Sequence, residues 1–167
     1  IVENVNKYGE VIGEGANYYD KINGAVINSE AVAKGLSFDI DGVKIDVLQT
    51  WDIADGTSNV NDTSIVLRFT IGEQTVLFLN DLGSIGGRRL LATYGDKLKS
   101  DIVQMAHHGH MNCSMEVYAA IRPEACLWCA QHWLYNEVEE PPYLSDVAKL
   151  RRMGRIRMYG TAVTREW

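Results

Sequence analysis

Several features that would classify this chain at once are scarce or missing. Its 167 residues include only three cysteines and three prolines. No apolar run reaches the roughly 18 residues that a membrane-spanning helix needs, so we expect no membrane segment. The net charge of −6 argues against nucleic-acid binding through a basic surface. With 46% hydrophobic and 23% charged residues and neither a repeat nor a low-complexity segment, the sequence predicts a single globular domain over residues 1–167.

The three cysteines give little chemistry of their own. Their odd number precludes complete pairing within the chain and slightly favours a reducing compartment such as the cytoplasm. Cys126 and Cys129 form a C-x-x-C, which could indicate zinc or redox chemistry. No second C-x-x-C or matching histidine pair follows, and the flanking residues are typical of a buried strand. Plain core cysteines are therefore the favoured interpretation.

Apolar periodicity predicts an α/β chain. Residues 36–40 and 43–48 alternate about Asp41-Gly42, which predicts a β-hairpin. Four further β-branched or apolar runs predict strands, at residues 63–70, 75–80, 101–106 and 126–130. Helical spacing is found at residues 89–98, 114–121 and 145–154, a glycine-bearing turn is expected at 83–87, and a closing strand or hairpin at 156–159 and 162–163. The order is hairpin, two antiparallel strands, then alternating helix and strand.

Acidic and imidazole side chains follow two neighbouring core strands. Asp81 comes where one strand ends, and His107, His108 and His110 come where the next one ends. A carboxylate and imidazoles on one rim of a sheet suit zinc or a similar metal. Each group also has an ordinary interpretation, Asp81 as a turn or capping residue and the histidines as a surface turn. A catalytic zinc takes three protein ligands and water, and no third ligand is evident.

Three motifs follow one another along the chain: residues 61–68 (NDTSIVLR), 76–81 (VLFLND) and 101–109 (DIVQMAHHG). In this order they resemble the metallo-β-lactamase superfamily, most closely the hydrolase domain of competence-type DNA-uptake channel proteins, and residues 121–125 (IRPEA) add a further match. That branch carries an N-x-x-S-x-V-L strand, an L-L-T-G-D strand end and a D-x-L-K-V-P-H-H-G-S strand end. The resemblance extends over roughly residues 36–160 and falls on the C-terminal half of the family's domain.

The resemblance implies a fold and a chemistry. The chain would be half of an αββα sandwich, a mixed sheet with flanking helices. Asp81 matches the aspartate that bridges two metal ions, zinc or other divalent metals. His107 or His108 supplies a histidine ligand, with the choice left open. In this family a metal-bound water attacks an ester, amide or phosphodiester.

The departures from the family are equally informative. The principal ligand signature H-x-H-x-D-H is absent from this sequence, Asn80 replaces the glycine before the aspartate, and His110 replaces a small Ser or Thr. We therefore expect a fragment that carries a minority of a metal site and has little activity alone. The alternative is a degenerate, non-catalytic binding or structural module.

The resemblance also implies partners. Because the chain opens at Ile1 in mid-pattern, we expect an excised or processed piece whose N-terminal metal-binding half is missing. A lone half of the sandwich would leave one sheet face uncovered, which predicts a homodimer through that face. The substrate would be an unidentified small molecule or phosphodiester.

Overall fold

A computed structural model describes residues 33–50, 59–109, 113–130 and 156–160. The chain divides into two compact units, Ile1–Ala31 and Val32–Trp167, and every described residue lies in the second. The prediction of one domain over the whole chain therefore stays a prediction. The helix expected at 145–154, residues 162–163 of the expected closing segment, and His110 fall outside the described residues.

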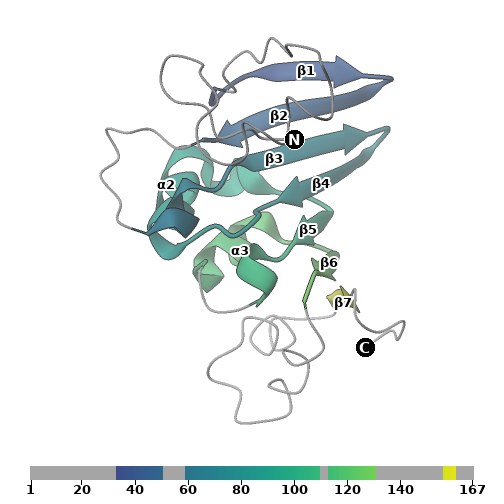
Figure 1. Ribbon diagram of the computed structural model, residues 1–167. Helices are drawn as coiled ribbons and strands as arrows, with labels where there is room; N and C mark the ends of the chain where they lie inside the picture. The colour runs from purple at the N-terminus through teal and green to yellow at the C-terminus, as the bar shows by residue number, and fades with distance from the viewer. Residues whose placement is uncertain (1–32, 51–58, 110–112, 131–155, 161–167) are drawn as a thin grey trace, which may run out of the picture. The chain divides into compact units, whose positions relative to one another are not determined.

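The described residues form one mixed sheet of seven strands (Figure 1). The strands are β1 (Ser37–Ile40), β2 (Val43–Gln49), β3 (Val66–Ile71), β4 (Gln74–Phe78), β5 (Ile102–Gln104), β6 (Ala125–Trp128) and β7 (Arg157–Gly160). They lie in the sheet in sequence order. Neighbours from β1 to β4 are antiparallel, and those from β4 to β7 are parallel. The predicted order of hairpin, antiparallel pair and alternating helix and strand is confirmed from β1 to β6, and so is the α/β class.

The β1–β2 hairpin forms for the reason that its turn sequence predicts. Asp41 and Gly42 have φ values of 51° and 81°, the paired positive values that a tight two-residue turn needs. The carboxylate of Asp39 accepts a hydrogen bond from the backbone N–H of Gly42 at 2.9 Å. Local chemistry alone therefore sets this register, and Ile40 pairs with Val43.

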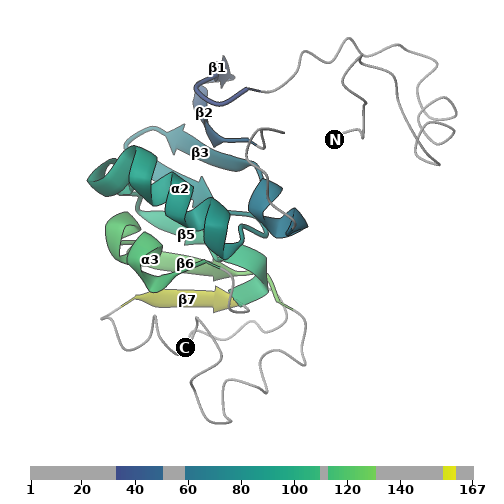
Figure 2. The ribbon, with the colours of Figure 1, turned by 90° about the vertical axis from the view of Figure 1, so that its left-hand side faces the viewer.

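Two helices cover one face of the sheet (Figure 2). These are α2 (Ser84–Tyr94) and α3 (Met115–Ile121), with a 3-10 turn at Gly95–Leu98 after α2. The main core lies between them and the sheet. Leu77 and Val103 from the sheet pack with Leu90 from α2 and Tyr118 from α3, and all four are fully buried. Burying this face is the main source of stability for helices of this length.

The start of α2 differs from the prediction, which placed a glycine-bearing turn at residues 83–87. Those residues instead belong to the first turn of the helix and the residue before it. The buried carboxylate of Asp62, in a 3-10 turn at Val60–Thr63, accepts hydrogen bonds from the N–H groups of Ile85 and Gly86 at 2.8 and 2.9 Å. A Cβ on Gly83 would lie 2.3 Å from this carboxylate, so the glycine lets the cap approach.

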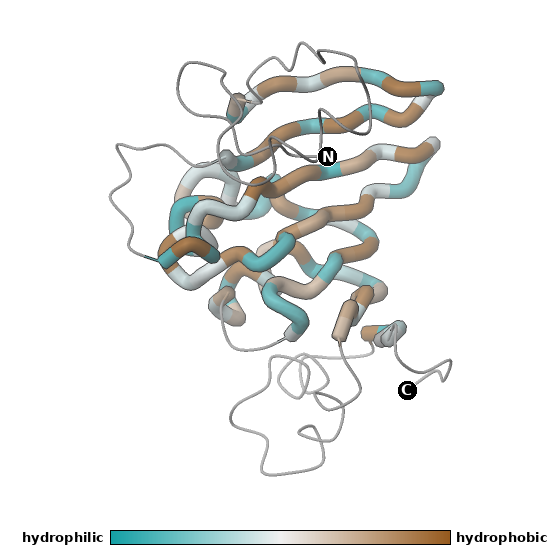
Figure 3. Tube along the Cα trace, viewed as in Figure 1, coloured by the Kyte–Doolittle hydropathy of each residue, from teal (hydrophilic) through white to brown (hydrophobic). Residues whose placement is uncertain are grey.

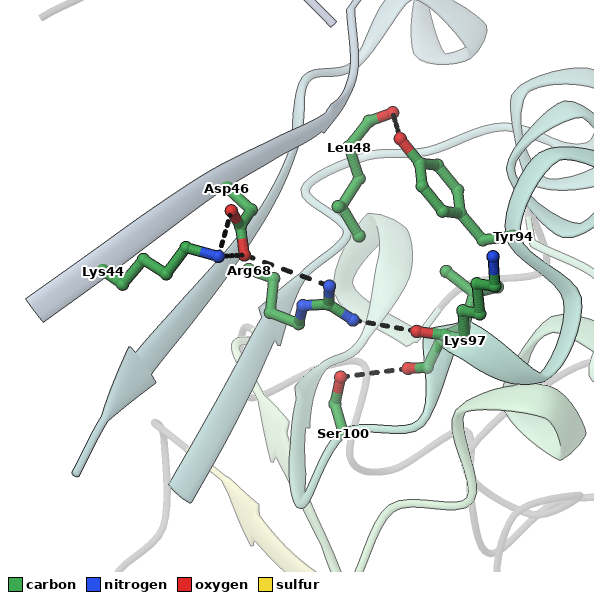
Figure 4. A network of polar contacts seen from close by, with 8 residues as sticks. Lys44, Asp46, Leu48, Arg68, Tyr94, Lys97 and Ser100 are labelled. Atoms are coloured by element: carbon green, nitrogen blue, oxygen red, sulfur yellow. Dashed lines mark hydrogen bonds and ion pairs between the residues drawn. The ribbon is translucent and has the colours of Figure 1, made fainter. Parts of the chain in front are cut away.

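A polar network fastens the end of α2 to β2 and β3 (Figure 4). Arg68 donates to the carbonyl of Lys97 at 2.8 Å and lies 3.9 Å from the carboxylate of Asp46. The hydroxyl of Tyr94 donates to the carbonyl of Leu48 at 2.9 Å. These contacts orient the helix over the sheet, while the apolar core beneath it provides most of the stabilisation.

The second face of the sheet is less bare than the sequence led us to expect. Hydrophobic residues run along the strands, and hydrophilic ones gather at the hairpin tips (Figure 3). On the face away from the helices, Ile45, Val47 and Ala125 are already buried within the chain. Other residues of this face are half-buried, namely Leu67, Phe69, Val76, Phe78, Ile102 and Leu127. Only its margins are more open, with Ile40 at 54% and Ile71 at 53% exposure.

The partner predictions are therefore wrong. A homodimer through an uncovered sheet, and a missing half to cover it, both required a bare apolar face. The central residues of that face, which would form such an interface, are already buried or half-buried within the chain. Within the described ranges, no helix combines the length and hydrophobicity that crossing a bilayer demands.

Candidate functional site

The candidate residues meet at one edge of the sheet. We call this the carboxyl edge, where the parallel strands β4, β5 and β6 end. Asp81 lies in the turn after β4, His107 and His108 in the turn after β5, and Cys129 directly after β6. Residues from neighbouring strand ends come together there, as expected for the ligand-binding edge of α/β proteins.

The structure distinguishes between the two histidines. The Nε2 atom of His108 and the Oδ1 atom of Asp81 are 3.7 Å apart, and the two side chains are 52% and 47% exposed. The rings of His107 and His108 lie with their centroids 5.8 Å apart. It is therefore His108 whose ring nitrogen faces the aspartate, at a position that solvent reaches.

The ring of His108 is held from its other side. Its Nδ1 atom lies 2.6 Å from the carbonyl oxygen of Cys129. A carbonyl oxygen only accepts hydrogen bonds, so Nδ1 carries the hydrogen in this contact. In the neutral ring, Nε2 then has a free lone pair directed toward Asp81. A backbone carbonyl on one ring nitrogen is the usual arrangement for a histidine that binds metal through the other.

Trp128 completes the support of this turn. Its buried indole donates from Nε1 to the backbone carbonyl of His108 at 2.7 Å. At the start of the turn, the backbone N–H of Ala106 donates to the hydroxyl of Tyr118 at 3.0 Å. Both aromatic rings belong to the main core, so the histidine turn is anchored to the rigid part of the fold.

The backbone of this turn is strained. His107, His108 and Gly109 have φ values of 44°, 59° and 76°. The first two residues each carry a side chain that disfavours the left-handed region, at about 1–2 kcal/mol per residue. Strain of this kind gathers at functional sites, where the surrounding structure holds it in place. Its presence here supports a function for the turn beyond connecting β5 to α3.

Asn80 is the third left-handed residue at this edge that is not glycine, with a φ of 51°. Asparagine tolerates this region better than other side chains. Its amide Nδ2 donates to the carbonyl of Ile65 at 2.7 Å. The change from the family's glycine to Asn80 therefore has a structural explanation and does not by itself indicate a lost function.

The cysteines agree with the interpretation of core residues. Cys113 and Cys126 are buried, Cys129 is half-buried, and none of these three cysteines forms a disulfide. Burial raises the pKa of the Cys126 thiol to about 12, so this sulfur stays protonated and is poorly suited to bind metal or to attack a disulfide.

Sequence reasoning missed the groups that orient the candidate ligands. Cys129 acts through its backbone carbonyl, so its side-chain type carried no signal. Tyr118 lies in the helix predicted at 114–121, and nothing in that helical pattern indicates that its hydroxyl accepts from the N–H of Ala106. Across the described ranges, no three His, Cys, Asp or Glu side chains cluster in a way that would hold a metal ion. The third ligand that a catalytic zinc needs is thus not found among these residues.

Comparison with known proteins gives no assignment. No family model matches this chain, and no curated protein matches it. The relation to the metallo-β-lactamase superfamily therefore stays a resemblance, which the three sequence motifs carry.

Proposed function

We propose that this chain belongs to a metal-dependent hydrolase of the metallo-β-lactamase superfamily, with its sheet and covering helices arranged as in one layer pair of the αββα sandwich. One observation carries the proposal. His108 Nε2 and Asp81 Oδ1 face each other from adjacent strand ends, and the contact of Nδ1 with the Cys129 carbonyl directs the lone pair of Nε2 to the aspartate. This pairing matches the residues that the resemblance selected.

The two side chains fit a divalent metal in part. An imidazole nitrogen and a carboxylate oxygen are both good zinc donors. They would supply two ligands, one short of the three that catalytic zinc sites use. We therefore propose that His108 and Asp81 would hold one side of a metal and that other donors complete the site. His107 would support the turn through its backbone hydrogen bond to Asn80.

The chemistry follows from the donor set. A bound zinc-like ion would acidify a water molecule for attack on an ester or phosphodiester bond and stabilise the charge that develops. Asp81 and His108 would fix the position of the ion. The half-exposed side chains of this pair leave the site open to solvent and substrate.

The competing function is a degenerate module without catalysis. It rests on Asn80 and His110 as departures from the family pattern. Asn80 has a structural explanation in its positive φ, which removes one of these two grounds. His110 lies outside the described residues, so the second ground stands.

Metal binding by the chain tests the proposal directly. Co²⁺ is titrated into the protein and its visible absorption recorded, with Asp81→Ala, His108→Ala and His107→Ala side by side. We expect weak binding that the first two substitutions abolish and that His107→Ala largely retains. Asp39→Ala, an exposed acid elsewhere on the sheet, is the control. Binding unaffected by Asp81→Ala and His108→Ala would contradict the proposal.

Activity provides the second test. In the full-length protein with Zn²⁺ added, Asp81→Ala is expected to abolish metal-dependent hydrolysis of an ester or phosphodiester. Full activity in that variant would rule out the assigned role for Asp81.

A further inference from the structure

The two candidate ligands lie beyond the hydrogen-bonded part of their strands. The β4–β5 ladder ends at the pair Phe78 and Gln104. Asp81 and His108 come three and four residues later along their strands. Their separation therefore depends on contacts other than the sheet ladder.

Gln104 provides such a contact through its side chain. This side chain is buried, with only 8% exposure, and in register it lies between Phe78 and Leu127. Its Oε1 atom accepts a hydrogen bond from the backbone N–H of Asn80 at 2.7 Å. Its Nε2 atom donates to the carbonyl of Met105. Both ends of a buried amide are thus used, as burial of a polar group requires.

Asn80 transmits this restraint to the histidine turn. Its backbone carbonyl accepts a hydrogen bond from the N–H of His107 at 2.8 Å. Asn80 therefore donates a hydrogen bond to the Gln104 side chain of β5 and accepts one from the turn that follows β5. Asp81 is its neighbour along the chain, and His108 is the neighbour of His107.

We propose that Gln104 is a positioning residue for the Asp81–His108 pair, which it holds together through the backbone of Asn80. This inference rests on the proposed function for the meaning of the pair, while the geometry of the contact stands apart from it. Gln104 suits the position because one neutral side chain supplies both an acceptor for Asn80 and a donor for Met105.

Substitution of Gln104 separates its hydrogen bonds from its packing. Gln104→Met keeps a similar length and volume but removes both polar groups. Gln104→Glu keeps an oxygen that can accept from Asn80. Gln49→Met is the matched control, because Gln49 is the other buried glutamine among the described residues, at 7% exposure. The three variants and the unsubstituted protein are all studied as the full chain.

The first measurement is amide hydrogen exchange by NMR without added metal. In Gln104→Met we expect exchange at Asn80 and His107 to rise about tenfold relative to Leu77 in the same sheet, the effect of one lost hydrogen bond. Gln104→Glu should keep both amides protected. Unchanged exchange in Gln104→Met, or equal loss of protection in Gln104→Glu, would overturn the inference. If Gln104→Met does not fold, the Gln104→Glu result alone decides.

The second measurement is Co²⁺ affinity. Gln104→Met should raise the dissociation constant about tenfold, as loss of an outer support around a metal site does, while Gln49→Met should leave it unchanged. An equal effect of the two substitutions would contradict a specific role for Gln104. If Co²⁺ binding by the unsubstituted chain does not depend on Asp81 and His108, the proposed function fails. The exchange measurement still decides whether Gln104 holds the two strand ends together.

Discussion

The two ends of β5 are built differently. Before the strand, Asp101 pairs with β4: its carboxylate accepts hydrogen bonds from the backbone N–H and the hydroxyl of Thr75, both at 2.8 Å. Its carbonyl accepts from the N–H groups of Glu124 and Ala125, next to and within β6. Neither Thr75 nor Asp101 has a positive φ. After the strand, His107 and His108 are both left-handed.

The difference shows that one sequence motif serves two purposes. Residues 101–109 form a single motif in the resemblance to the metallo-β-lactamase superfamily. In the structure its acidic start fixes the register of three strands, and its histidine end holds strained side chains at the open carboxyl edge. Stability and candidate chemistry are therefore assigned to opposite ends of a strand of three residues.

The largest effect on stability is expected at the start of β5. Asp101→Ala removes the charged acceptor of two hydrogen bonds and should lower the free energy of unfolding by about 2 kcal/mol, measured by urea denaturation. Asp101→Asn, which keeps one acceptor oxygen, should lose about half as much. The metal affinity of the site should change little. A large loss of Co²⁺ affinity in Asp101→Ala with preserved stability would contradict the assignment of stability to the start of β5 and of metal binding to its end.

This contribution should depend on pH. The hydrogen bonds from Thr75, first from its backbone and then from its side chain, hold the pKa of Asp101 below its usual value. A lowered folded-state pKa stabilises the protein above the pKa of the unfolded chain, about 4. The difference in stability between the unsubstituted chain and Asp101→Asn should therefore be constant from neutral pH to about pH 4 and shrink below it. A difference that grows as the pH falls would contradict this assignment.

An intermediate effect is expected from Tyr118→Phe, beneath the histidine turn. The substitution leaves the buried N–H of Ala106 without its acceptor and should cost about 1.5 kcal/mol. Faster hydrogen exchange at Ala106 would report the loosened turn. Tyr94→Phe, which removes the hydroxyl that donates to the Leu48 carbonyl of β2 on the same face of the sheet, is the control and should leave Ala106 protected. Loss of protection in both variants would mean that the effect is not local to the turn.

The smallest effect is expected from Asn80→Gly. Glycine relieves the left-handed backbone of Asn80 by about 1 kcal/mol but removes the amide bond to Ile65, of similar size. We expect a net change within about 0.5 kcal/mol in thermal denaturation. Asn80→Ala, which keeps the strain and loses the bond, should cost about 1 kcal/mol more than Asn80→Gly. Equal stability of the two variants would indicate that the left-handed conformation is not maintained.

Local patterns predicted much of the fold. The β1–β2 hairpin was predictable because Asp41-Gly42 determines the turn by itself. The start of α2 was not, because its cap is Asp62, more than twenty residues earlier and in a different turn. The strand predicted at residues 75–80 corresponds to β4, which ends at Phe78 and not at Asn80. Asn80 has a left-handed backbone, and its hydrogen bonds to Gln104 and Ile65 join residues too far apart in the sequence for a local pattern to reveal.

The site was predictable only as a set of residue types. Asp81 and the histidine pair follow strand ends in the sequence, so their common edge could be foreseen. The choice of His108 over His107 could not, because it depends on the carbonyl of Cys129, at the end of another strand. That carbonyl belongs to the backbone and leaves no trace in the identity of the residue.

The left-handed turn at His107 and His108 also affects which substitutions the chain can accept. For the backbone alone, glycine would suit both positions better than histidine, because glycine incurs no penalty at a positive φ. The His108 ring offsets part of this penalty through its contact with the Cys129 carbonyl. Glycine at position 108 would therefore exchange a relaxed backbone for a lost hydrogen bond across the carboxyl edge.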